Sequence, residues 1–126
     1  MRYLLDTAFL IDHMRGDVGA RVRMLQLWEH ATAIYVNEIV VCELVAGLTV
    51  DDLAEGEALI RPLEFIQPGP ESAVLAGRWR GEALRHGRTL SLADALIAAA
   101  AAAVQATVLT RNLRDFSMTP VQLESY

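Results

Sequence analysis

The sequence contains no lysine, since all 11 of its Lys and Arg residues are arginines. A receiver-type phosphotransfer domain needs a lysine near its last strand, so this absence counts heavily against that class of acidic α/β protein. The formal net charge of −5 argues against a protein that coats nucleic acid through bulk positive charge. Arginine nevertheless suits bidentate contacts with phosphate, so a local nucleic-acid contact stays open.

Cysteine is nearly absent as well. The one cysteine, Cys42, excludes an intramolecular disulfide, and its apolar neighbours predict a buried, inert thiol. No charged-then-apolar leader opens the chain, and the alanine-rich run over 95–109 is too weakly hydrophobic to span a bilayer. No Pro- or Gly-rich linker divides the sequence. We therefore expect a single domain over residues 1–126, soluble and cytoplasmic.

Short apolar runs alternate with helical patterns along the chain. We predict strands over 2–5, 33–36, 63–66 and 106–110, with a fifth over 121–125, and helices over 7–14, 17–31, 38–48, 51–61, 71–87 and 91–105. Val22, Leu25 and Trp28 lie along one side of the second helix. Asn37 is a predicted N-cap and Gly87 a predicted C-cap. This alternation predicts an α/β fold with a parallel sheet and helices on both of its faces.

Ligands of such sheets bind outside the carboxyl ends of the strands, so acidic residues there are candidates for a functional site. Asp6 ends the first strand, where it is about equally well explained as a helix N-cap. Asp94 forms an S-x-x-D pattern with Ser91, which is also typical of helix capping. Asp115 follows the fourth strand, where an ordinary turn with Asn112 would account for it.

Glu43 is the acid that structure alone explains least well. It lies in the apolar stretch "VVCELVAG", and an unpaired buried glutamate costs on the order of several kcal/mol. A solvated helix face or a buried ion pair with an arginine are the structural alternatives. We favour a functional role.

Together, these acids predict a metal site. Asp6 and the Asp115 segment follow strands, while Glu43 and Asp94 lie on helices that can face the same strand ends. Clustered carboxylates repel one another unless a cation compensates, and oxygen ligands without histidine or thiolate favour Mg²⁺ or Mn²⁺. Such sites serve phosphoryl chemistry.

Four segments carry a resemblance to a known family. These are "LLDTAFLID" at the start, "VCELVAGL" in the middle, "SLADALIAAAA" later and "VLTRNLRDF" near the end. In order and spacing they resemble the PIN-domain family, and within it the VapC-type toxin ribonucleases of bacterial toxin–antitoxin pairs. The resemblance covers essentially the whole chain. It implies a parallel sheet of four or five strands.

The resemblance also implies roles for individual residues. Asp6, Glu43 and Asp94 correspond to the core acidic ligands of the metal. The fourth acid of the family falls either where this chain has Asn112 or at Asp115, so here Asp115 would carry that role beside a neutral Asn112. The resemblance further implies that the hydroxyl groups of Thr7 and Thr110 orient the carboxylates or a water molecule.

The activity implied is hydrolysis of single-stranded or looped RNA by metal-activated water, which leaves 5′-phosphate and 3′-hydroxyl ends. Arg111 and Arg114 are candidates for RNA backbone contacts. The arginines between 78 and 88 are candidates too, although a solvated helix face explains them at least as well.

The family also implies protein partners. One is a small cognate antitoxin that covers the cleft, and the other is a second copy of the chain in a homodimer. Trp28 and Trp79 are candidates for lining an antitoxin groove, although core packing is the favoured explanation for both. The alternative function is a non-catalytic PIN-like module that binds RNA or protein. Retention of all the acids named above favours the catalyst.

Overall fold

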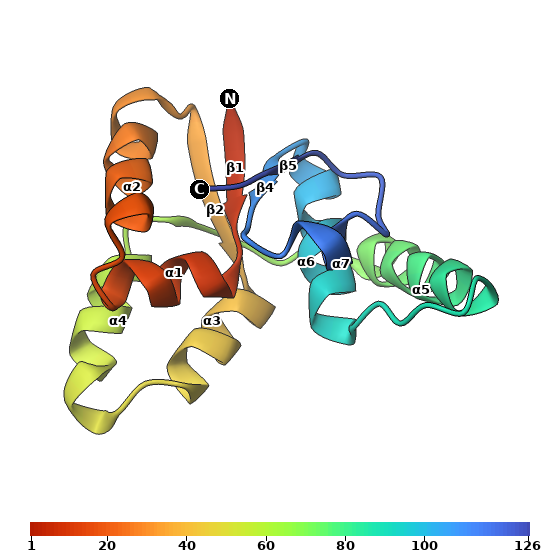
Figure 1. Cartoon of the computed structure of the whole chain (residues 1–126), viewed down its shortest axis with the longest axis horizontal. Helices are drawn as coiled ribbons and strands as arrows, with labels where there is room; N and C mark the ends of the chain where they lie inside the picture. Colours follow the sequence, from red (N-terminus) through yellow and green to blue (C-terminus); the bar gives the residue numbers. More distant parts are fainter.

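The computed structural model describes residues 1–126 and contains a sheet of five parallel strands in the order β3-β2-β1-β4-β5 (Figure 1). The strands are β1 (Arg2–Leu5), β2 (Ala33–Asn37), β3 (Glu64–Ile66), β4 (Thr107–Leu109) and β5 (Leu123–Glu124). The first four lie within one or two residues of the predicted positions, and the fifth is confirmed as a short edge strand. The predicted α/β class is confirmed.

Helices lie on both sides of the strands, as predicted. They are α1 (Thr7–Met14), α2 (Val18–His30), α3 (Glu38–Ala46), α4 (Leu53–Ile60), α5 (Pro70–Arg85), α6 (Leu92–Val104) and α7 (Leu113–Phe116), with a 3₁₀ turn at Val50–Asp52. Figure 1 places α1 to α4 on one side of the strands and α5 to α7 on the other. Right-handed crossovers produce this division, because the chain reverses direction across the sheet after β3.

Side-chain caps fix where several helices begin. Asn37 accepts a hydrogen bond from the Val40 amide at the start of α3, and Ser91 accepts one from the Asp94 amide at the start of α6. Gly87 takes a left-handed φ of 69° one residue after the His86 cap of α5, which suits a residue without a Cβ. The predicted caps at Asn37 and Gly87 therefore mark real helix ends.

The core lies between the sheet and its helices. Its largest fully buried side chains include Phe9, Phe116, Leu4, Leu5 and Met24. Trp79 is partly buried and packs against this core, in agreement with the favoured explanation for that residue. None of the helices meets the length and hydropathy needed to cross a bilayer.

Two expectations about exposure are wrong. Cys42 is exposed rather than buried, and Trp28, for which core packing is the favoured explanation from the sequence, is 46% exposed. Glu43, one residue along α3 from Cys42, is exposed too, which agrees with the solvated helix face considered as an alternative for it. Val22, Leu25 and Trp28 face solvent, since the buried side of α2 is formed by Ala20, Met24 and Leu27. Both sides of α2 carry apolar residues, and α3 is apolar nearly all round, so periodicity alone does not select the buried side.

Two shorter segments also differ from the prediction. The helix expected over 51–61 begins as the 3₁₀ turn and continues as α4. The ordinary turn considered as an alternative explanation for Asn112 and Asp115 is instead the start of the four-residue helix α7.

Candidate active site

The site lies where β1 and β4 end side by side. Leu5 pairs with Leu109 in the parallel register, so the next residues, Asp6 and Thr110, emerge together. The chain continues from β1 toward β2 and returns to β4 from the opposite side, which makes this gap the switch point of the sheet. Switch points are where open α/β sheets bind ligands.

Asp6 is held by two donors. Its Oδ1 accepts a 2.8 Å hydrogen bond from the Thr7 amide, and its Oδ2 accepts a 2.7 Å hydrogen bond from the buried Thr110 hydroxyl. Asp6 is only 6% exposed, and burial raises the pKa of its carboxyl above the usual range, while these two hydrogen bonds oppose the rise. Asp6 is therefore both the N-cap of α1 and a carboxylate fixed at the strand end.

Glu43 and Asp94 reach the same place from the two helical layers. The Thr7 hydroxyl donates a 2.8 Å hydrogen bond to Glu43 Oε1, which ties α3 to the start of α1. Asp94 lies in the first turn of α6 and is half-buried. The capping pattern is only half formed, because Ser91 Oγ accepts from the Asp94 amide but the Ser91 amide does not donate to the Asp94 carboxylate in return.

These side chains surround an open cavity of about 610 Å³. Its lining consists of Asp6, Thr7, Ala8, Ile11, Arg15, Glu43, Asp94, Arg111 and Asn112. The predicted convergence of Asp6, Glu43 and Asp94 on one cleft is therefore present. The cavity is wide and strongly polar, which suits an extended charged substrate better than a small apolar ligand.

Asp115 occupies a different position from the other acids. It does not line the cavity, but its Oδ2 accepts a 2.9 Å hydrogen bond from Asn112 Nδ2. The same amide group approaches Asp94 Oδ2 at 3.5 Å. Asn112 is thus the residue on the cavity wall, and Asp115 lies behind it.

Burial and the surrounding acids together raise the pKa of Asp94 to about 6. Desolvation is the largest cause, followed by the charges of Asp6, Asp115 and Glu43, while the Ser91 hydroxyl lowers the pKa. No three Asp, Glu, His or Cys side chains are grouped closely enough to hold a metal ion together. The donor chemistry and the mutual repulsion nevertheless fit a hard divalent cation.

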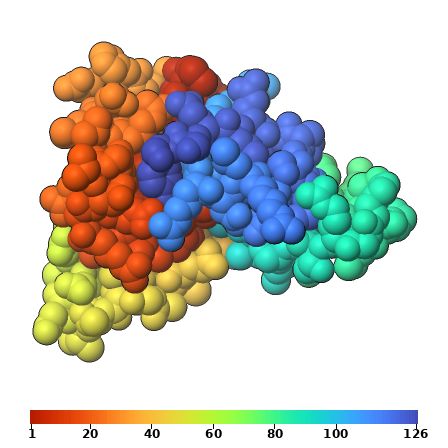
Figure 2. Space-filling model, viewed as in Figure 1, coloured from red at the N-terminus to blue at the C-terminus, as the bar shows by residue number.

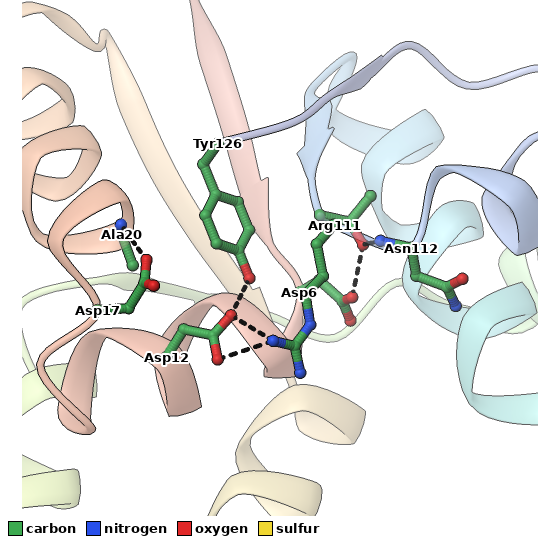
Figure 3. Close-up of polar contacts among 8 residues, drawn as sticks. Asp6, Asp12, Asp17, Ala20, Arg111, Asn112 and Tyr126 are labelled. Atoms are coloured by element: carbon green, nitrogen blue, oxygen red, sulfur yellow. Dashed lines mark hydrogen bonds and ion pairs between the residues drawn. The ribbon is translucent and has the colours of Figure 1, made fainter.

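Three residues of the site were missed in the sequence. Arg15 lines the cavity, Asp12 is buried and paired with Arg111, and Tyr126 donates to Asp12 (Figure 3). An acid on the apolar side of the helix over 7–14 was a usable signal for Asp12. Nothing in the sequence marks Tyr126, because its contact depends on tertiary folding. Arg114 is exposed and lies outside the cavity lining.

The sequence matches the family described as PIN domain over residues 3–120. Ribonuclease VapC19 of Mycobacterium tuberculosis is 34% identical over 117 residues, which cover 93% of this chain and 94% of that protein. Ribonuclease VapC of Rickettsia bellii is 27% identical, with 95% of this chain and 92% of that protein covered.

Solved structures agree with this assignment. DNA-bound VapBC from Salmonella typhimurium has a TM-score of 0.85 at 25% identity and covers 99% of this chain and 98% of that chain. VapBC2 from Rickettsia felis bound to a promoter DNA fragment also has a TM-score of 0.85, at 24% identity. The match covers 100% of this chain and 99% of that chain and shows that the two share a fold. The chain therefore belongs to the PIN-domain family and, within it, to the VapC-type ribonucleases.

Proposed function

We propose that the chain is a metal-dependent endoribonuclease and the toxin of a toxin–antitoxin pair. The observation that carries the proposal is the placement of Asp6, Glu43 and Asp94, from three separate elements, around one open cavity at the sheet's switch point. The names of the VapC relatives as ribonucleases support the reaction class.

Asp6, Glu43 and Asp94 are the residues that would hold Mg²⁺ or Mn²⁺, with Asp115 acting directly or through Asn112. A bound cation would supply Lewis-acid polarisation of the scissile phosphate and an activated water. To hold one cation together, the carboxylates would have to turn toward one another, because no three of them are grouped closely enough in this structure. The open cavity leaves room for that movement.

The remaining polar residues orient these carboxylates and contact RNA. Thr7 and Thr110 fix the Glu43 and Asp6 carboxylates through their hydroxyl groups. Arg111 lies in the cavity and is placed to contact a phosphate of the RNA backbone, with the exposed Arg114 nearby in sequence. Direct attack of water on phosphorus would leave 5′-phosphate and 3′-hydroxyl ends.

A cognate antitoxin is the expected protein partner, and the assemblies of the VapBC neighbours support it. A second cavity of about 310 Å³, lined by Met14, Leu44, Leu48 and others, shares Ile11 and Arg15 with the acidic cavity. Its other lining residues are Gly47, Thr49, Asp52 and Glu55, so this mixed apolar and acidic cavity suits a peptide segment that carries both apolar and basic side chains. The homodimer and the cytoplasmic location stay predictions, and light scattering of the purified chain would test the first.

The proposal is tested by incubating purified, partner-free chain with end-labelled cellular RNA in Mg²⁺, in Mn²⁺ and in EDTA. We expect discrete fragments that require the cation and are lost in Asp6→Asn, Glu43→Gln and Asp94→Asn. Glu38→Gln is the matched control, because Glu38 lies on the same helix as Glu43 but outside the cavity.

Mapping the fragment ends for 5′-phosphate tests the route of attack. A folded wild-type chain that binds the cation and RNA but cuts nothing in the pool would favour the non-catalytic binding module instead.

A further inference from the structure

Arg111 is anchored in the cavity by a residue that the metal chemistry does not use. Its Nη1 donates to both carboxylate oxygens of Asp12, at 3.0 Å to Oδ1 and 2.9 Å to Oδ2 (Figure 3). Its Nη2 and Nε make no hydrogen bond within the chain. The guanidinium is thus held by one nitrogen, with its other donors free.

Asp12 is held in place by burial and by a hydrogen bond from Tyr126. Its side chain is 11% exposed, whereas that of Arg111 is 59% exposed, so the acid is the buried anchor and the arginine the accessible end. The Tyr126 hydroxyl donates a 2.6 Å hydrogen bond to Asp12 Oδ2. The Tyr126 ring meets Phe9 edge-on with 4.8 Å between centroids, which holds the phenol in place.

The anchor joins segments that are far apart in the sequence. Asp12 belongs to α1, Arg111 follows β4 and Tyr126 follows β5. Figure 2 shows the N-terminal and C-terminal parts of the chain meeting on one face of the molecule. Arg111 is also next to Thr110, whose hydroxyl donates to Asp6. Anchoring the Arg111 guanidinium therefore also sets its position relative to the acids of the cavity.

We propose that Asp12 and Tyr126 are positioning residues, which orient the Arg111 guanidinium in the acidic cavity so that its free donors meet a phosphate of the RNA backbone. This inference rests on the proposed ribonuclease function for its substrate. An ion pair with a flexible arginine loses part of its value to side-chain entropy, and prior fixation by Asp12 removes that cost before RNA arrives. A pair serving only to tie α1 to β4 would not need to leave two donors open to the cavity.

Positioning and simple charge repulsion predict opposite changes in RNA affinity when Asp12 loses its carboxylate. Removing the Asp12 carboxylate makes an acidic protein less acidic, so simple electrostatics predicts tighter RNA binding for Asp12→Asn. Positioning predicts weaker binding, because Arg111 is then free to move. The two effects separate in a double-mutant cycle with Arg111→Gln, since Asp12 has nothing to orient once the guanidinium is gone.

The test measures RNA binding in EDTA, where no cleavage occurs, by anisotropy of a fluorescein-labelled single-stranded RNA of roughly 16 nucleotides. We expect Arg111→Gln to raise Kd about tenfold, the loss of one charge-assisted hydrogen bond. Asp12→Asn should raise Kd about threefold by itself and leave it unchanged or lower it when combined with Arg111→Gln. Asp51→Asn is the matched control, because it makes the same substitution at an exposed aspartate that lies outside the cavity lining.

A second variant guards against a folding defect at the buried acid. Tyr126→Phe keeps the ring against Phe9 but removes the donor to Asp12, and it should raise Kd about twofold with an unchanged melting curve. Additive effects in the cycle, tighter binding in Asp12→Asn alone, or an Arg111→Gln variant that binds as the wild type does would each overturn the inference. Cleavage by the wild type, measured separately with Mg²⁺, reports on the proposed function independently of this binding cycle.

Discussion

The Thr110 hydroxyl donates a 2.7 Å hydrogen bond to Asp6 Oδ2, although 104 positions separate the two residues in the sequence. The bond is buried, and it exists because β1 and β4 are neighbours with Leu5 opposite Leu109. One consequence is that the orientation of the acid after the first strand depends on the residue that follows the fourth strand.

Thr110→Val should therefore impair the site without changing its shape. Valine matches threonine in form but leaves Asp6 Oδ2 without its donor, at a cost of about 1–3 kcal/mol in the free energy of unfolding. We expect cleavage to fall roughly 10- to 100-fold, as for other groups that orient metal ligands. Thr110→Ser keeps the hydroxyl and should retain most activity. Equal activity in the valine and serine variants would contradict this role.

The pH dependence of stability should reveal the strain on Asp94. Its pKa is about 6 in the folded chain against 3.8 in the unfolded chain, so between these values the folded state holds the proton more tightly. The contribution of the Asp94 carboxyl to the free energy of unfolding is fully present below pH 3.8 and is lost as the pH rises through about 6. In EDTA, the melting temperature of Asp94→Asn should therefore rise relative to that of the wild type as the pH increases. At neutral pH the variant should melt roughly 2 to 5 °C higher than the wild type.

Thermal melting of both chains across this pH range checks the prediction. Because the side chain is half-buried, solvent screening limits the effect. A purely capping Asp94 would give the opposite result, since its loss would then destabilise the helix by about 1 kcal/mol at neutral pH.

Divalent cations should offset the repulsion among the carboxylates of Asp6, Glu43 and Asp94. Mg²⁺ or Mn²⁺ at about 100 times its Kd should stabilise the wild type by about 2.7 kcal/mol, and calorimetry should show binding together with release of protons near pH 6. Asp6→Asn and Asp94→Asn should lose most of this gain, whereas Glu38→Gln should keep it. A melting temperature that does not respond to either cation would count against the metal site.

Local signals in the sequence predict the frame of the site well. Alternating apolar runs give the strands, and caps such as Asn37 mark where helices start, because both depend on residues close in the chain. Asp6, Glu43 and Asp94 are found by their placement after or beside strand ends. The contact between Tyr126 and Asp12 is not predictable in this way, since it forms only when distant strands pair.

Exposure is harder to predict for helices that are apolar on several sides. In α3 the buried residues are Val40 and Leu44, Ile39 and Val41 are partly buried against the core, and Cys42 and Ala46 are exposed. Cys42 should accordingly react with a thiol reagent such as DTNB within minutes in the native protein, at a rate close to that of the unfolded chain. Reaction only in denaturant would show that the thiol is buried after all.

Helix α2 allows the sharpest comparison, because two leucines two positions apart differ almost completely in exposure. Leu27 is 2% exposed and Leu25 is 63% exposed. Leu27→Ala removes packed methyl groups and should lower the free energy of unfolding by about 2–5 kcal/mol. Leu25→Ala, the matched control, should change it by less than about 0.5 kcal/mol in the monomer. Urea denaturation measures both values, and a large loss in Leu25→Ala that depends on protein concentration would instead indicate that the exposed side of α2 is buried between copies of the chain.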